Sequence, residues 1–227
     1  MTRLTTCRLT VFFSASLLAI APSAFAVDGA ILSNQNTSVN GLPGCPHAGF
    51  PIIICQSGSY RLSGDLTMIT SAAGNYSGVD IAIGIASSKV TLDLNGFPIT
   101  VNDFLGDSLT HDFFAIAELG TFSQVTVRNG TVTLNSTRAS NEGVDHMFGI
   151  YLQTSSKQTI EAINIAGNQP RLVRPFLVIP GKSSLIRSVV TNGVISPFCP
   201  SLIIDAVGRM NASVNCVIIN NSDSAYP

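Results

Sequence analysis

Tryptophan is absent from this chain of 227 residues, tyrosine occurs only 4 times, and charged residues make up 11% of the sequence. The chain therefore has few of the large flat rings that commonly stack against ligands. Phe50, Phe104 and Phe198 are candidate substitutes, but a role in the core or as loop anchors is the simpler interpretation. The formal net charge of −1 gives no basis for nucleic-acid binding, which depends on an excess of Lys and Arg.

The signature motifs of several enzyme classes are also missing. The sequence has no Gly-x-Ser-x-Gly nucleophile elbow and no His-Glu-x-x-His zinc motif. No two cysteines have the Cys-x-x-Cys spacing that is typical of structural zinc sites. We therefore expect neither a metal site nor a cofactor.

The longest apolar run lies at the N-terminus. Arg3 and Arg8 precede or border the apolar stretch 9–21, and Ala24-Phe25-Ala26 has the small-x-small pattern of a cleavage site. Residues 1–26 are therefore predicted to be a signal peptide, with an uncleaved membrane anchor as the alternative. No later apolar segment approaches the length of a membrane span, so we expect a secreted, periplasmic or cell-surface protein.

Four cysteines follow the predicted signal: Cys45, Cys55, Cys199 and Cys216. An even number in an exported chain favours disulfides, and the sequence alone allows three pairings. We expect Cys45–Cys55 and Cys199–Cys216, because each pair closes a local loop near one end of the chain. A zinc site is the alternative.

Three segments share one pattern: VTLDLNGFPIT from Val90, VTVRNGTVT from Val125 and VVTNGVIS from Val189. In each, two runs rich in β-branched residues flank Asn-Gly. Apolar residues alternate with small polar ones, as in half-buried strands, and helical periodicity is nearly absent after the signal. The pattern predicts a coil of stacked strand-turn-strand units.

The predicted strands group into repeating units. In chain order, the units are Val79–Ile85, Lys89–Leu94 and Phe97–Val101; Phe113–Leu119, Gln124–Arg128 and Thr131–Asn135; Gly149–Gln153, Gln158–Ile163 and a weak strand near Ile165; Phe176–Ile179, Leu185–Val190 and Val194–Ser196; and a degenerate unit with Ser201–Ile204 and Val214–Ile219. Treating Leu92, Val127, Ile160 and Ile186 as equivalent gives steps of 35, 33 and 26 residues. This spacing predicts a β-solenoid of about four to five coils.

The turns carry a second pattern, because Asn95, Asn129, Asn164 and Asn192 recur at similar points of the units. Asn and Gly adopt positive φ at low cost, and stacked Asn side chains can form a hydrogen-bonded ladder. The alternative is a sandwich of ordinary antiparallel hairpins with type I′ turns.

With GFPIIICQSGSYRLSGDLT from Gly49, VTLDLNGFPIT and VTVRNGTVT, the chain resembles the exported right-handed parallel β-helix proteins of pectate-lyase-like fold. The resemblance runs from about Val27 to the end and is strongest from Phe50 to Leu134. It implies an all-β parallel β-helix and export, but no activity, because this architecture serves many functions. We expect an N-terminal segment and cap over 27–78, with Phe50–Thr67 forming the cap, and repeats over 79–227 with a degenerate C-terminal end.

A near-repeat before two successive predicted strands supplies the candidate catalytic residues. His111-Asp112-Phe113-Phe114 matches Asp145-His146-Met147-Phe148, and Arg174 holds the equivalent position in the next unit. Stacking would bring Asp112, His146 and Arg174 into one column that is suited to proton transfer or to holding an anionic sugar. The alternative is a set of solvated loop charges that form weak surface pairs.

Other charged residues are candidates for binding. The candidates in the neighbouring loops are Asp103, Asp107, His111, Glu142 and Asp145. Asp93 and Arg128 occupy equivalent outward positions, which predicts an ion pair between adjacent coils, with catalysis as the alternative. Arg171, Arg174 and Arg187 are candidates for pairing with sugar carboxylates, although simple exposure also explains them.

The sequence favours a non-catalytic extracellular or cell-surface module that contacts polysaccharide. The main alternative is a polysaccharide lyase or glycoside hydrolase acting on an acidic polysaccharide through Asp112, His146 and Arg174. A third interpretation is a truncated member of the family, because the repeats weaken after Asn168. The oligomeric state has no signal in the sequence.

Overall fold

The computed structural model describes residues 30–45, 47–70, 78–103, 112–136, 147–152, 157–167, 176–179, 184–197, 201–210 and 217–220. The predicted signal, residues 1–26, lies outside the described residues. Within the described part of the chain, no helix is long and apolar enough to cross a membrane.

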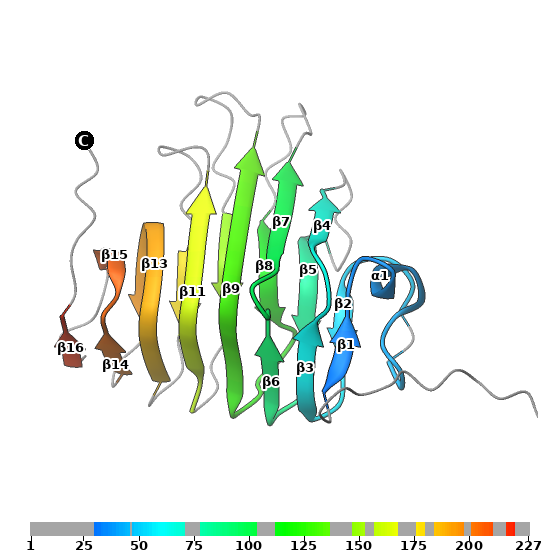
Figure 1. Ribbon diagram of the computed structural model, residues 1–227, viewed down its shortest axis with the longest axis horizontal. Coiled ribbons are helices and arrows are strands. Elements are labelled where there is room, and N and C mark those ends of the chain that lie inside the picture. The colour runs from blue at the N-terminus through cyan, green and yellow to red at the C-terminus, as the bar shows by residue number, and fades with distance from the viewer. Residues whose placement is uncertain are drawn as a thin grey trace, which may run out of the picture.

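The protein is a parallel β-helix, as the sequence predicts. Its sixteen strands all pair in parallel, and the only antiparallel contact within the described ranges is an isolated bridge between Leu42 and Cys45. Figure 1 shows successive windings of the chain side by side along the long axis of the molecule. The alternative of antiparallel hairpins is therefore wrong.

The chain runs over three faces of the solenoid in turn, which we call faces C, A and B, although the last two coils have no described strand on face C. Face C contains β2 (Ile52–Ile54), β5 (Asp80–Ile85), β8 (Phe113–Glu118), β10 (Met147–Tyr151) and β12 (Phe176–Ile179). Face A contains β1 (Ile31–Ser33), β3 (Gly58–Leu62), β6 (Val90–Asp93), the N-terminal halves of β9 (Val125–Ser136), β11 (Thr159–Gly167) and β13 (Ser184–Pro197), and then β14 (Ser201–Ile204) and β16 (Val217–Ile219). Face B contains β4 (Leu66–Ile69), β7 (Pro98–Asp103), the C-terminal parts of β9, β11 and β13, and β15 (Val207–Met210).

The register confirms the predicted repeat. Leu92 pairs with Val127, Val127 with Ile160, and Ile160 with Ile186, so the steps are 35, 33 and 26 residues. The next two steps, from Ile186 to Ile203 and from Ile203 to Ile218, are only 17 and 15 residues. The coils therefore shorten toward the C-terminus. The sequence pattern missed β15.

The alternation of apolar and polar residues explains the core. Along face A, Val90, Leu92, Val125, Val127 and Ile160 are at most 1% exposed, while the residues between them point outward. Because like positions stack, these side chains form continuous apolar columns inside the solenoid, and each column buries its members against the coils on either side.

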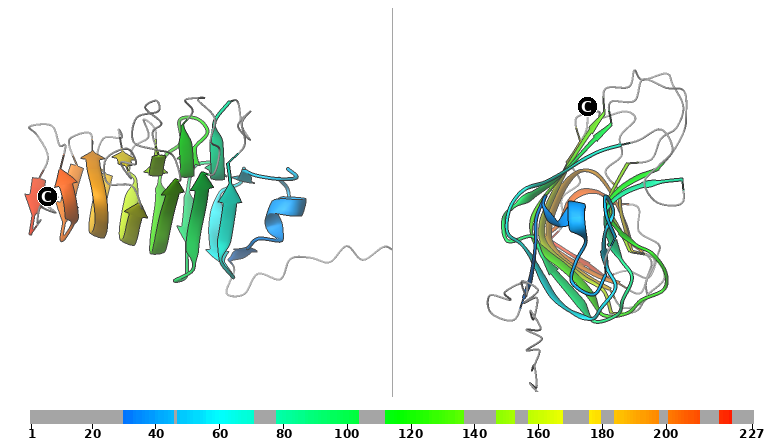
Figure 2. Two further views of the ribbon diagram at one scale, coloured as in Figure 1. Left: turned by 90° about the horizontal axis from the view of Figure 1, so that it is seen from above. Right: turned by 90° about the vertical axis from the view of Figure 1, so that its right-hand side faces the viewer.

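The N-terminal end is closed by a cap that precedes the first coil. Figure 2 shows the short helix α1 (Thr37–Asn40) over the end of the solenoid. Leu42, 3% exposed, packs into the core there. The side chain of Gln35 accepts from the Thr67 N–H (2.8 Å) and donates to the Thr67 carbonyl (3.1 Å), so it covers the free edge of β4 as a neighbouring strand would.

The segment Phe50–Thr67, which the sequence predicts as the cap, contains strands of the first coil. Strands β2, β3 and β4, which span most of Phe50–Thr67, pair in register with β5, β6 and β7. Within this segment Tyr60 and Leu62 point inward, as the alternation predicts. The Cys45–Cys55 disulfide confirms one of the two predicted pairings and ties the cap to the end of β2. Cys199 and Cys216 lie outside the described residues, so their pairing stays a prediction.

Two of the predicted turn asparagines take the left-handed conformation, but their side chains donate to the Leu62 carbonyl and to Asp93 Oδ1 rather than to each other. Asn95 and Asn129 have positive φ, at 54° and 59°. Asn164 does not occupy the equivalent position, because Arg128 pairs with Glu161 and Gly130 with Ile163, which places Ala162 opposite Asn129. Ala162 takes the left-handed conformation (φ 52°), and Asn164 pairs with Thr131 within the strand. Asn192 follows Thr191, which pairs with Ile165, so it too lies beyond the turn.

Candidate functional site

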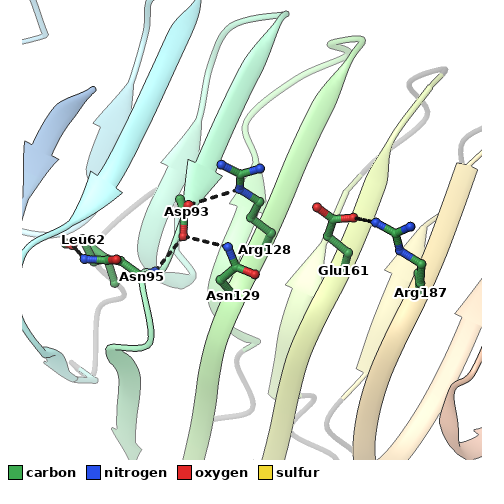
Figure 3. Close-up of polar contacts among 7 residues, drawn as sticks. All are labelled: Leu62, Asp93, Asn95, Arg128, Asn129, Glu161 and Arg187. Atoms are coloured by element: carbon green, nitrogen blue, oxygen red, sulfur yellow. Dashed lines mark hydrogen bonds and ion pairs between the residues drawn. The ribbon is translucent and has the colours of Figure 1, made fainter. Parts of the chain in front are cut away.

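Charged residues of alternating sign form a column on the outer surface of face A. Its members, in register from coil to coil, are Arg61, Asp93, Arg128, Glu161 and Arg187. Each follows the inward apolar residue of its strand by one position, so all five point away from the core. We call this set the charged column, and Figure 3 shows its members from Asp93 to Arg187.

Asp93 holds the centre of the charged column. Its Oδ2 accepts from Arg128 Nε (3.1 Å), and its Oδ1 accepts from the Asn95 backbone N–H (2.8 Å) and from Asn129 Nδ2 (3.3 Å). Asn95 in turn donates from Nδ2 to the Leu62 carbonyl of the previous coil (3.2 Å). Asp93 therefore links its own turn to the next coil, which confirms the predicted ion pair with Arg128.

The charged column continues through a second ion pair. Glu161 accepts from the Arg187 guanidinium, and the two residues are register partners. The Arg187 side chain is 52% exposed and that of Arg128 is 38% exposed, whereas the side chains of Glu161 and Asp93 are 20% and 11% exposed. The cations are thus the more accessible members of both pairs.

Arg61 differs from the other two arginines. It lies in register with Asp93, but the Asp93 carboxylate is bonded to Arg128, Asn95 and Asn129. The buried Nε of Arg61 has no hydrogen-bond partner among the residues that the structure describes. This guanidinium is therefore a cation without a bonded anion in the described part of face A.

A column of hydroxyl groups runs beside the charged column. Ser59, Thr91, Thr126 and Thr159 are register partners two positions before the charged residues of their strands. All four are at least partly exposed. Face A therefore presents charged groups and hydroxyl groups in two parallel lines.

The predicted catalytic column precedes three strands of face C. Phe114 pairs with Phe148, and Phe148 pairs with Phe176, and these are the residues that follow the three candidates by two positions in the sequence. Asp112 is partly exposed, and its carbonyl accepts from the Asp80 N–H (3.2 Å). His146 and Arg174 lie outside the described residues, as do Asp107, His111, Glu142, Asp145 and Arg171.

An aromatic cluster, which the sequence reasoning missed, lies on the outer surface of face C. The rings of Phe114 and Phe148 stack with centroids 4.7 Å apart and planes 5° apart, and Tyr151 lies 5.4 Å from each. The same near-repeat that aligns Phe114 with Phe148 is the signal that predicts this stack. Phe114 is only 9% exposed, so the cluster is largely enclosed.

Asp103, a candidate binding residue, lies inside the fold. It is 0% exposed at the end of β7, and its carboxylate accepts from Thr70 Oγ1 (3.2 Å) and Ser136 Oγ (2.9 Å) on the adjacent coils. Glu118 is similarly buried at 5% exposure and accepts from Gln158 Nε2 (3.2 Å). Both carboxylates join neighbouring coils through hydrogen bonds. Phe50, named above as an aromatic candidate, packs against the core.

Within the described ranges, no group of three or more His, Cys, Asp or Glu residues is arranged to hold a metal ion. Comparison of the chain with protein-family models, with curated proteins and with solved structures finds no match.

Proposed function

We propose that the protein is an exported, non-catalytic extracellular or cell-surface module of the β-helix type that it resembles, and that it binds acidic polysaccharide along face A. The charged column is the observation that carries this proposal. Its three arginines recur on every second coil of a rigid sheet, about 9.6 Å apart at twice the usual strand spacing. A linear acidic polysaccharide likewise presents carboxylates at regular intervals.

Arginine suits this role because its planar guanidinium can pair with a carboxylate through two parallel hydrogen bonds. Arg128 contacts Asp93 through Nε (Figure 3), which leaves its terminal nitrogens with donor capacity for a ligand. Asp93 and Glu161 hold Arg128 and Arg187 in place, which lowers the conformational entropy that binding must remove. The adjacent line of hydroxyl groups supplies donors and acceptors for sugar hydroxyls.

Affinity electrophoresis of the purified full-length chain in gels containing polygalacturonate or alginate tests this proposal. We expect the acidic polymer to retard the protein. This retardation should weaken as the salt concentration rises from about 0.1 M to about 1 M, because the Debye length falls from about 10 Å to about 3 Å. Arg128→Gln and Arg187→Gln should each raise Kd about tenfold, or about 1.4 kcal/mol. Lys89→Gln removes one exposed positive charge at a turn away from the charged column and is the matched control. If all three substitutions change Kd equally, the charged column is not the binding site.

The second candidate is a polysaccharide lyase or glycoside hydrolase that uses Asp112, His146 and Arg174. The register of Phe114, Phe148 and Phe176 favours it, because the three candidates precede these residues at one spacing. Assays of pectin and alginate for unsaturated products and for new reducing ends distinguish it from the module. Activity that Asp112→Asn abolishes would establish the enzyme, whereas inactive protein that still binds polygalacturonate would support the module.

A further inference from the structure

Face B presents an uncharged and mostly polar surface next to face A. Three outward columns run across its coils in register. They consist of Thr67, Thr100, Thr133 and Ala166; of Ile69, Asn102 and Asn135; and of Pro98, Thr131 and Asn164. None of these ten residues is charged and none is buried. We call Thr100, Thr133, Asn102 and Asn135, which lie on the adjacent strands β7 and β9, the Thr/Asn surface.

The amides of the Thr/Asn surface are oriented by a hydrogen bond, and the surface keeps donors and acceptors that are not engaged by other described residues. Asn135 Nδ2 donates to Asn102 Oδ1 (2.9 Å), so the two amides are oriented as a ladder. This bond leaves the Asn102 amide nitrogen and the Asn135 amide oxygen with capacity for other partners. The side-chain hydroxyls of Thr100 and Thr133 make no hydrogen bond with any residue that the structure describes.

The Thr/Asn surface is also rigid. Beneath it the inward residues Ile99, Val101, Val132 and Leu134 are all 0% exposed. Neighbouring strands lie about 4.8 Å apart and outward residues on one strand about 6.6 Å apart, so the hydroxyls and amides form a regular grid. Groups that are held in place before binding lose little conformational entropy when a ligand arrives.

We propose that the Thr/Asn surface is a second binding site and that it takes an uncharged, hydroxyl-rich polysaccharide. A charged polymer finds no counter-charge on these columns, and an apolar ligand would bury the threonine hydroxyls without partners. Sugar hydroxyls both donate and accept, as the threonines and asparagines do. The site extends the proposed role in polysaccharide binding, but it is separate from the charged column and uses no residue of it.

Affinity electrophoresis of the full-length chain in gels containing dextran, xyloglucan or mannan tests the site, with polygalacturonate as a separate arm. We expect at least one neutral polymer to retard the protein, with little dependence on salt. Thr100→Val/Thr133→Val removes two hydroxyls while keeping the β-branched shape, and should raise Kd for that polymer at least tenfold without changing retardation by polygalacturonate. Thr121→Val removes a hydroxyl at an exposed position that belongs neither to the Thr/Asn surface nor to the columns of face A, and should leave binding of the neutral polymer unchanged.

Thermal melts show whether the variants fold. Should the double valine variant melt early, Thr133→Lys, which places a bulky charge at a partly exposed position, replaces it and should also abolish retardation by the neutral polymer. The proposal is overturned when no neutral polymer retards the wild-type chain, or when folded variants of the Thr/Asn surface bind as the wild type does. If the wild-type chain binds a neutral polymer but does not bind polygalacturonate, the function proposed for face A is rejected and the Thr/Asn surface remains supported as a binding site.

Discussion

At the scale of single residues, Asp93 shows how one side chain can join two coils. Its carboxylate is 11% exposed and accepts hydrogen bonds from its own turn and from the following coil. Glu161 occupies the equivalent position two coils later, but its described contact is the pair with the half-exposed Arg187. The two acidic residues of the charged column therefore contribute differently to stability.

Removing Asp93 should destabilise the fold more than removing any other member of the charged column. We expect Asp93→Ala to lower the free energy of unfolding by about 2–3 kcal/mol, because three donors lose a charged acceptor. Glu161→Ala should change it by less than about 1 kcal/mol, as is usual for an exposed ion pair. Urea denaturation measures both values, and equal losses would contradict the central role of Asp93.

Gly130 is required at its position because of packing. A Cβ built on Gly130 would lie 2.3 Å from Leu94 Cβ, on a buried side chain of the previous coil. Gly130→Ala should therefore cost about 1–3 kcal/mol through overpacking. Gly64→Ala is the matched control, because its Cβ would meet Asn34 Cβ at an ordinary 3.8 Å. Similar melting temperatures for the two variants would contradict the packing argument.

The buried phenol of Tyr60 should make the folded protein less stable at alkaline pH. It is 2% exposed, and burial raises the pKa of its phenol above the ordinary value of 10.0. Above about pH 10 the unfolded chain releases this proton while the folded chain retains it, so the free energy of unfolding falls as pH rises through the folded pKa. Below about pH 10 the group adds no pH dependence.

Tyr60→Phe isolates this effect. The variant should be less stable at neutral pH, because the Tyr60 hydroxyl donates to the Gln56 carbonyl (2.8 Å), but its stability should fall less between about pH 9 and pH 11. Urea melts at the two pH values provide the comparison. The same alkaline loss in both proteins would assign it to other groups.

The sequence predicts some residue roles well and others poorly. The spacing of Leu92 and Val127 is enough to predict the Asp93–Arg128 pair, because each charge follows a recognisable core position. Extending the same rule to Arg61, Glu161 and Arg187 predicts the whole charged column. The sequence has no comparable pattern that predicts the burial of Asp103. This burial depends on β7 continuing as far as Asp103, which the alternation of residues does not determine.

At the scale of elements, the cap and the strands depend on different interactions. The central strands are fixed by ladders to both neighbouring coils, whereas the cap is held by β1, by the contacts of Gln35 and by the Cys45–Cys55 disulfide. The cap should therefore open before the central coils do.

Removing the disulfide should loosen the cap without unfolding the solenoid. Cys45→Ser/Cys55→Ser opens a loop with a sequence separation of 10 and should reduce stability by about 2–3 kcal/mol. Hydrogen exchange should accelerate in β1 and β2 and remain slow in β9. The double variant leaves Cys199 and Cys216 intact, so the effect reports the N-terminal bridge alone. Uniform acceleration over all strands would show that the cap and the coils open together.

The sequence predicts most strands because their alternation is regular, and it fails where the chain departs from that regularity. The third unit has Ala162 at the left-handed turn, so the recurrence of asparagine misplaces the turn at Asn164. The apolar segments of the first coil lie outside the Asn-Gly pattern, so that pattern alone does not predict its strands. Its strands are recognisable only through their pairing with β5, β6 and β7.

At the scale of the whole molecule, stacking converts sequence equivalence into spatial proximity. The shortening of the coils, from a step of 35 residues to one of 15, tapers the repeat toward the C-terminus. The charged column on face A and the Thr/Asn surface on face B both exist only because neighbouring coils keep strict register. Both proposed binding sites therefore depend on that register.

Cysteine cross-linking on face B measures the register most directly. Thr100 and Thr133 are register partners, so Thr100→Cys/Thr133→Cys should form a new disulfide in mild oxidant, because parallel neighbours lie about 4.8 Å apart. Asn135 lies two positions from the partner of Thr100, so Thr100→Cys/Asn135→Cys, with Cα atoms about 8 Å apart, should not. Mass spectrometry of non-reduced digests distinguishes the new bridge from the Cys45–Cys55 disulfide. Cross-linking of the first pair alone is the predicted result, and cross-linking of the offset pair alone, or of neither, would contradict the stacked arrangement.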